Sequence, residues 1–348
     1  MRPEGRMMKK KHNMPAVTTV LLLLLAAAAV ISVMVGRYSI TPSVFLEILT
    51  HGSGPYESEE VEAAALVLFE SRLARIVAAV LIGAALSAAG AAYQGIFRNP
   101  MVSPDILGAA TGASFGAALA ILLGGNAFVI QISAFCFGLA AVAVAYFASS
   151  ALTGQSGGAT LTLVLTGMVV AALFSAFISI VKFVGDPYDT LPTITFWLMG
   201  GLTYVTKSDL LIMLVPFAAG MIPLMLLRWR LNVLSLDEEE SSALGVDTKK
   251  TRGIVILCAT LMSSSAVAVG GMIGWVGLIV PHIARMIAGP DYAKMLPCSV
   301  LTGGLFLLVV DDLARCLFAQ EIPLGVLTAI IGAPFFLYLM FKGKKSFI

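Results

Sequence analysis

The sequence predicts an all-α polytopic membrane protein with about ten transmembrane helices, some of them short or broken. Of its 348 residues, 59% are hydrophobic and 12% are charged, whereas about 25% of a soluble domain is charged. Apolar runs of the roughly 20 residues that a helix needs to cross a bilayer recur along the whole chain. One polar segment, Leu231–Arg252, interrupts them and holds four consecutive carboxylates, Asp237 to Glu240. This pattern excludes a soluble protein.

The first apolar run, residues 15–36, follows a basic segment and resembles a signal peptide in that respect. It is longer than the apolar region of most signal peptides and lacks a small-x-small cleavage site before Gly36. We therefore expect a retained span. The chain then divides into a basic cytoplasmic N-terminus, residues 1–14, and a single ten-span domain, residues 15–348.

The remaining spans are expected where the apolar runs are long enough to cross. A shorter apolar piece, residues 191–202, is too short and should lie along the surface or dip into the membrane. The nine further spans are 73–97, 102–123, 127–149, 158–184, 208–227, 252–270, 272–288, 296–318 and 323–341.

The distribution of positive charge predicts the orientation of the chain. With the N-terminus in the cytoplasm, 16 of the 22 Lys and Arg residues fall on the cytoplasmic side and six outside, as the positive-inside rule requires. An even number of spans returns the C-terminus to the cytoplasm. The polar segment Leu231–Arg252 then faces the cytoplasm.

Two glycine patterns stand out within the apolar runs. Gly108, Gly112 and Gly116 are spaced four apart, which lets membrane helices approach closely; simple packing and a moving interface both fit this spacing. The other pattern contains Gly270, Gly274 and Gly277, followed by Pro281, and cannot form one uninterrupted helix. A broken helix at membrane depth is tolerated beside protein or a water-filled cavity, which favours a transport path.

Charged residues are scarce within the spans. Asp311 and Arg315 lie four apart, as in a helical ion pair, although Arg315 could instead offer its charge to a partner. Arg72 and Arg75 open the second span, where they could anchor the helix at the membrane interface or receive an acidic surface. A buried mid-span carboxylate, typical of ion-coupled carriers, is missing.

The sequence shows no sign of an enzyme. It lacks a GxxxxGK[ST] loop for phosphates, and it lacks HExxH, GxSxG and clustered Cys/His ligands. We therefore expect no catalytic residues, no metal site and no cofactor bound by this chain. If ATP powers it, another polypeptide must hydrolyse that ATP.

Several ordered blocks resemble the FecCD-type permeases, the membrane subunits of ATP-driven importers of iron–siderophores, haem and cobalamin. The resemblance covers nearly the whole chain after residue 40. The blocks are RLAR from Arg72, GAALSAAGAAYQGIFRNPMVSPDILGAATGASFGA from Gly83, WLMGGL from Trp197, LSLDEEESSALGV from Leu234, GWVGLIVPHIARMIAGPD from Gly274, and VDDLAR with IPLGVLTAIIGAPFFLYLM near the C-terminus.

The resemblance implies a homodimer in the plasma membrane of a prokaryote, with the transport path at the dimer interface. It also implies two cytoplasmic ABC ATPase subunits, which use ATP and Mg²⁺, and one extracytoplasmic substrate-binding protein. Nothing suggests a nucleic acid partner. The family's coupling helix, which enters a cleft of the ATPase, matches residues 234–246. Ser241–Ser242 departs from the Ala-Arg that is common there.

The resemblance also assigns roles to individual residues. The arginines that receive acidic residues of the binding protein match Arg72, Arg75 and Arg315. The coupling residues are expected at Leu234, Leu236, Glu239, Ala243, Leu244 and Gly245. The cytoplasmic gate and path are expected at Gln94, Asn99, Pro100, Met101 and Thr160, with the opposing gate element near Leu152 to Thr160.

An iron–siderophore is the expected cargo, with cobalamin or haem as alternatives within the same importer type. The rival class is a secondary carrier driven by an ion gradient, which would work without an ATPase. A membrane-embedded enzyme is a third class, and no credible catalytic constellation supports it.

Overall fold

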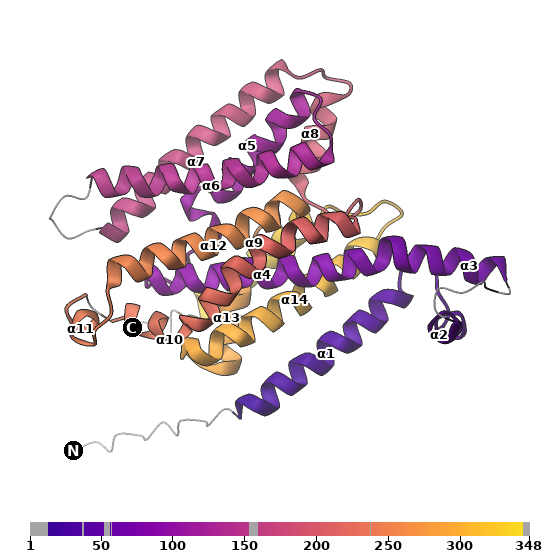
Figure 1. Ribbon diagram of the computed structural model, residues 1–348, viewed down its shortest axis with the longest axis horizontal. Helices are drawn as coiled ribbons and strands as arrows, with labels where there is room; N and C mark the ends of the chain where they lie inside the picture. The colour runs from indigo at the N-terminus through magenta and orange to yellow at the C-terminus, as the bar shows by residue number, and fades with distance from the viewer. Residues whose placement is uncertain are drawn as a thin grey trace.

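The computed structural model describes residues 13–36, 38–51, 56, 58–152, 159–236 and 238–343. Within these ranges the regular structure is entirely helical. Eight of the helices are long and apolar enough to cross a membrane. Figure 1 shows most of them running roughly along the long axis of the molecule, with α3 at one end and α11 at the other. The predicted all-α membrane fold is confirmed.

The long helices follow the predicted spans closely. Their ends differ from the expected ones by a few residues, because hydropathy locates an apolar run better than it locates a helix terminus. They are α1 (Met14–Met34), α4 (Leu73–Ile96), α6 (Ala127–Leu152), α7 (Ala159–Val184), α9 (Lys207–Leu226), α12 (Thr248–Gly270), α14 (Tyr292–Cys316) and α15 (Leu324–Gly343).

Two of the ten expected spans are shorter than predicted. The helix expected over residues 102–123 is α5 (Ala109–Leu122), preceded by the single 3₁₀ turn η2 (Pro104–Leu107). The helix expected over residues 272–288 is α13 (Val276–Ala288). In each case backbone with positive φ separates the helix from what precedes it, at Gly108 (+83°) and at Gly271 (+68°).

Three helices lie at one end of the bundle, and two of them were not among the predicted elements. These two are α2 (Pro42–His51) and α3 (Glu59–Leu66), which is capped by the hydroxyl of Ser58. A π-helical turn, η1 (Val67–Arg72), joins α3 to α4, so that Glu59–Ile96 forms one continuous helix of 38 residues. The third, α8 (Thr190–Met199), is the short apolar piece expected not to cross.

At the opposite end lie the short helices α10 (Arg228–Leu234) and α11 (Glu238–Ala243). One helix was expected over residues 234–246, but the chain leaves helical geometry after Leu234. The hydroxyl of Ser235 donates to the carbonyl of Asn232 at 2.6 Å, and such local bonds from serine compete with helix continuation.

Helix α4 is the centre of the fold and packs against α14, α12, α13 and α9. Its alanines and glycines let the neighbouring backbones approach closely. A Cβ on Gly83 would meet the carbonyl of Gly303 on α14. One turn further, the Ser87 hydroxyl lies 2.6 Å from that of Ser299. This seam of small residues joins α4 and α14 along their length.

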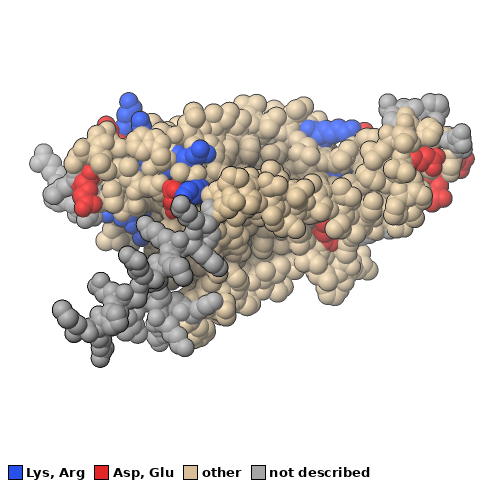
Figure 2. All heavy atoms as spheres, turned by 90° about the horizontal axis from the view of Figure 1, so that it is seen from below, with Lys and Arg blue, Asp and Glu red and all other residues tan. Residues whose placement is uncertain are grey.

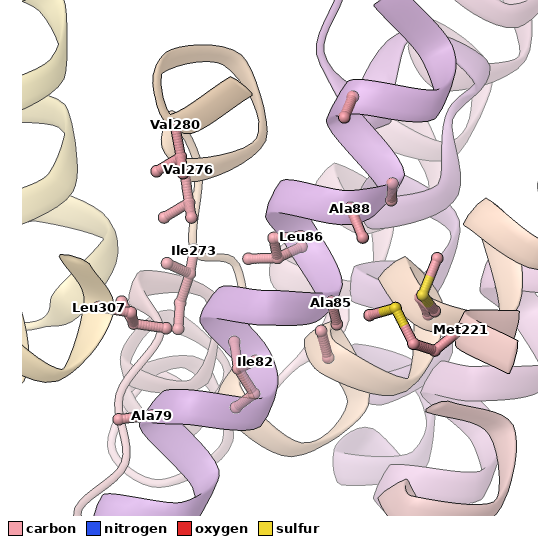
Figure 3. Close-up of a cluster of buried hydrophobic side chains, with 14 of the residues drawn as sticks. Ala79, Ile82, Ala85, Leu86, Ala88, Met221, Ile273, Val276, Val280 and Leu307 are labelled. Atoms are coloured by element: carbon pink, nitrogen blue, oxygen red, sulfur yellow. The ribbon is translucent and has the colours of Figure 1, made fainter. Parts of the chain in front are cut away.

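The core around α4 is dry and aliphatic. In Figure 3, Leu86 of α4 points toward Ile273 and Val276, which belong to the break before α13 and to its first turn. Ala85 faces Met221 of α9 instead. All but Met221 of these side chains are at most 5% exposed, so the break between α12 and α13 is held by packing against α4.

Charge and exposure fit a membrane setting. On the face shown in Figure 2, a belt of surface without charged side chains separates those near the α10–α11 end from those nearer α3. Large apolar side chains are exposed on the peripheral helices, such as Leu23 of α1 (65%) and Phe183 of α7 (89%). Such apolar surface is stable against lipid or another apolar surface.

Candidate functional site

The three predicted docking arginines converge at one end of the bundle. Arg72 ends η1, Arg75 lies in the first turn of α4, and Arg315 is in the last turn of α14. Together they line a hollow of about 170 Å³, which we call the arginine hollow. Its remaining lining residues are Gly36, Tyr38, Val67, Ser71 and Glu321.

The arginine side chains are mostly buried and bonded within the chain. Arg75 donates to both carboxylate oxygens of Asp311, with Nε 2.9 Å from Oδ2, and its other arm lies 2.9 Å from Glu321. Glu321 also accepts from the hydroxyl of Thr203 at 2.7 Å. Arg75 and Asp311 are 7% and 0% exposed. They therefore form a buried ion pair, in which two N–H groups of the guanidinium bond the two carboxylate oxygens.

Arg315 and Arg72 have different surroundings. Arg315 lies 3.3 Å from Asp311 and pairs with Asp312, and its NH2 group donates to the hydroxyl of Ser32 on α1 at 2.7 Å. The expected pair between positions 311 and 315 is therefore present, although Asp311 also bonds Arg75 on another helix.

Arg72 donates to the carbonyls of Val33 and Tyr38 and forms no ion pair with the other described residues. The arginine hollow thus combines three guanidinium groups with three carboxylates, those of Asp311, Asp312 and Glu321. Of these three arginines, only Arg72 is held solely by neutral groups among the described residues.

The predicted coupling residues occupy the opposite end, around α10 and α11. Leu236 and Leu244 are 39% and 60% exposed, while Leu234 is 3% exposed and packs inward. Ala243 ends α11 and is exposed, and Gly245 follows it with φ of +75°. Glu239 belongs to α11, and its side chain lies outside the described part, as does all of Asp237.

A buried hydroxyl ties α11 back to α10. Ser241 is 0% exposed and donates to the carbonyl of Val233 at 2.8 Å. This serine is one of the positions at which the sequence departs from the resembling family. We call residues 228–245, which comprise α10, α11 and the following turn, the coupling segment.

Asn232, which the sequence analysis did not single out, joins the coupling segment to α14. Its amide nitrogen donates to Asp291 at 2.8 Å, and its amide oxygen accepts from the backbone N–H of Tyr292 at 2.8 Å. Partial burial acts to raise the pKa of Asp291, but the bonds from Asn232 and the Ala293 N–H, with Lys294 nearby, hold that pKa below its usual value. The carboxylate therefore stays ionised at neutral pH.

The expected gate residues are grouped at the end of α4 nearest the coupling segment. Gln94 donates to the carbonyl of Leu278 at 3.2 Å and accepts from Arg285 at 3.1 Å, which ties α4 to α13. Asn99 continues the chain, and its side chain accepts from the Met101 N–H at 2.9 Å. Met101 is 52% exposed.

The Asn99–Pro100–Met101 segment, which we call the gate turn, is thus a compact turn with one exposed apolar side chain, that of Met101. Thr160, expected on the opposing gate element, lies half-buried in the first turn of α7. Residues 153–158 of that element are outside the described part.

The glycine face of α5 lies against α6. A Cβ on Gly112 would come 2.5 Å from that of Ala141, and one on Gly116 would meet the carbonyl of Ser133. Gly108 does not belong to this face of α5, because it precedes the helix and has a left-handed backbone. There it allows η2 to turn into α5.

The glycines and the proline of the broken segment lie in different elements of the structure. Gly270 ends α12, and the space around a Cβ on Gly274 is open within 4 Å. A Cβ on Gly277 would clash with Pro104 of η2 and with the carbonyl of Leu86 on α4, and a Cβ on Gly90 of α4 would clash with the carbonyl of Gly277. Pro281 is within α13. The break thus brings α13 against both α4 and η2.

Comparison with known proteins shows the same architecture elsewhere. The profile of the FecCD transport family matches residues 23–342. The molybdate import system permease protein MolB of Haemophilus influenzae is 41% identical over 317 residues, which are 91% of this chain and 93% of MolB. A Helicobacter pylori protein named as a probable iron chelatin transport system permease is 37% identical over 316 residues, 90% of this chain and 95% of that protein.

A solved structure resembles the whole fold. It is an inward-facing conformation of a transporter assigned provisionally to the metal-chelate type of ABC transporter. It superposes with a TM-score of 0.84 at 40% sequence identity, covering 94% of this chain and 99% of that one.

Proposed function

The chain belongs to the FecCD transport family of ABC importer permeases, and we propose that it imports an iron chelate of the siderophore type. In this family the permease spans the membrane while a separate ATPase subunit hydrolyses ATP. One observation supports a coupled importer most directly. The continuous helix Glu59–Ile96 carries two arginines of the arginine hollow and ends beside the coupling segment.

The proposed orientation places the coupling segment and both termini in the cytoplasm. The excess of Lys and Arg on that side supports it. The arginine hollow then opens toward the outside, where a substrate-binding protein would deliver the cargo.

We propose that an acidic side chain of the binding protein enters the arginine hollow. Arg72 is the natural first partner, because it donates to carbonyls and forms no ion pair with the described residues. Arg75 and Arg315 already hold carboxylates of this chain. Their proposed part in docking is to complete a positive rim, with partly exposed Glu321 as the carboxylate that an incoming acid would displace.

At the cytoplasmic end, the partner ATPase would bind the exposed part of the coupling segment. Leu236, Ala243 and Leu244 present apolar surface there, and Gly245 ends the turn. Exposed leucines at the two ends of a short helix suit insertion into a cleft of a partner. ATP and Mg²⁺ would be bound by that partner, and this chain would bind no cofactor.

Two copies of the chain would form the path between them. The permeases of this family work as pairs, and a homodimer is our proposal for this one. Gln94 and the gate turn would close the path on the cytoplasmic side, with Thr160 on the opposing element. A wall of Ala, Gly and Met binds a large chelate weakly enough to release it.

Molybdate is a second candidate cargo, because the 41% identical relative is named as a molybdate permease. Cobalamin and haem remain alternatives of the same importer type. The deciding experiment reconstitutes the chain with its ATPase and binding protein in vesicles. Radiolabelled ferric siderophore should enter only with ATP, and excess molybdate should not compete. Uptake that persists without ATP would instead indicate an ion-gradient carrier.

A further inference from the structure

Arg98 occupies a backbone position at which helices commonly place glycine. It follows the last residues of α4 with φ of +50°, a left-handed conformation that a side chain disfavours. The Arg98 N–H donates to the carbonyl of Gly95 at 3.3 Å, and the Asn99 N–H donates to that of Gln94 at 3.2 Å. This is the bond pattern of a Schellman helix end, with arginine where glycine is usual. Such an outlier points to a role for the side chain itself.

The side chain of Arg98 spans from α4 to the end of α10. Its Nε donates to the carbonyl of Leu234 at 3.1 Å, and its NH2 group donates to that of Leu236. The carbonyl of Leu234 belongs to the last residue of α10 and that of Leu236 lies just beyond it, where helix carbonyls lack intrahelical partners and a cation is favourable. Because both acceptors are backbone atoms, Arg98 follows the position of the coupling segment's backbone.

The coupling segment is itself held together beside this contact. Ser241 of α11 bonds the carbonyl of Val233, which precedes the two carbonyls that Arg98 bonds. Three nearby carbonyls therefore connect α11, α10 and Arg98. A displacement of α11 by a bound ATPase would move the same backbone that Arg98 holds.

The other end of Arg98 is the gate turn. Asn99 is the next residue, and it orders Met101 through its side-chain oxygen. A few residues on, Pro104 packs against Gly277 at the start of α13. The second link from the coupling segment, through Asn232, leads to the start of α14 instead. Arg98, the residue immediately before the gate turn, is thus bonded directly to the coupling segment.

We propose that Arg98 is a positioning residue that transmits movement of the coupling segment to the gate turn. The inference rests on the proposed function, in which the coupling segment receives the ATPase. It assigns Arg98 neither to the binding of ATPase nor to contact with cargo. Because Arg98 is exposed overall, loss of its bonds should leave the folded permease intact.

The test compares Arg98→Gly with wild type in reconstituted vesicles. Glycine suits the left-handed backbone while removing the guanidinium, so this variant should fold and bind the ATPase. We expect ATP hydrolysis within about twofold of wild type and uptake per ATP lower by about tenfold, within the range of typical coupling between sites. Arg98→Lys, which keeps one charged donor, should recover part of the uptake. Lys249→Gln, which removes an exposed charge at the same end, should behave as wild type.

A second readout follows the gate itself. In a variant whose four cysteines are replaced by serine, Met101→Cys reports gate access by its rate of labelling with a hydrophilic maleimide. Labelling should change when a non-hydrolysable ATP analogue binds, and Arg98→Gly should abolish that change. A preserved response, unchanged uptake per ATP, or loss of the ATPase from Arg98→Gly would each overturn the proposal.

The failure of the proposed function would look different. A wild-type complex that does not take up ferric siderophore would contradict the cargo. The labelling response of Met101→Cys needs no cargo, so it would still decide the role of Arg98.

Discussion

Arg75 and Asp311, which lie 236 residues apart in the sequence, form a buried pair with two parallel bonds between α4 and α14. Removing Asp311 takes away the buried partner of Arg75 and leaves it only the partly exposed Glu321. Asp311→Ala should therefore lower the free energy of unfolding by about 3–5 kcal/mol, measured by thermal and denaturant unfolding in detergent.

Two further variants identify the cause of that loss. Lys207→Met breaks the exposed pair with Glu70 and should cost at most about 1 kcal/mol. Arg75→Met combined with Asp311→Leu should recover much of the stability, because no buried charge is then unpaired. A double variant as unstable as Asp311→Ala would contradict this account.

Binding of the substrate-binding protein should depend on Arg72, although this side chain is only 5% exposed. Arg72→Gln keeps a polar side chain with N–H donors but removes the charge. We expect the binding protein to bind about tenfold more weakly, equivalent to about 1.4 kcal/mol, with ATPase binding unchanged. Affinity can be measured with permease in nanodiscs, with Lys207→Gln as an exposed control at the same end. Loss of the ATPase instead would show that the two ends have been assigned the wrong way round.

The exposed turn after α11 should determine ATPase binding without affecting folding. Leu244 is 60% exposed, so Leu244→Asp should leave the melting temperature near that of wild type and prevent co-purification of the ATPase. Gly245→Val should act more mildly, because it disfavours the left-handed backbone by about 1–2 kcal/mol and meets open space. Full ATP-driven uptake by Leu244→Asp would exclude this turn from coupling.

Close approach of α4 and α14 should make their glycines sensitive to a single methyl group. A Cβ on Gly303 would come within 2.5 Å of the Ser87 Cβ and would meet the carbonyl of Gly83. Gly303→Ala should lower stability by about 1–3 kcal/mol. Gly274→Ala adds the same methyl where nothing lies within 4 Å, and should be close to neutral in unfolding experiments.

The spans could be predicted from sequence because hydrophobicity is a local property. The ends of ranges such as 208–227 and 252–270 differ from those of α9 and α12 by at most four residues. The short α5 was harder, because residues 102–108 are apolar enough to extend it. Only the backbone at Pro104 and Gly108 shows that the helix begins later.

The contacts of the site could not be predicted, because they join residues far apart in sequence. Arg75 was singled out by its place at the start of a span, but nothing local indicates Asp311 as its partner. Arg98 carried no signal beyond its charge. Its positive φ could not be predicted, because arginine has no preference for left-handed backbone. The docking, coupling and gate roles stay predictions that the experiments above address.

The continuous helix Glu59–Ile96 also keeps a cluster of glutamates apart from the arginine hollow. Its exposed first turn carries Glu59, Glu60 and Glu62, and at about 1.5 Å per residue the turn begins roughly 20 Å from Arg72. The Debye length is about 8 Å at physiological salt and about 30 Å at 0.01 M. In cells, an acidic partner at the arginine hollow would therefore barely sense these glutamates. In dilute buffer their repulsion would reach it, so that association measured at low salt would report the glutamates together with the arginines.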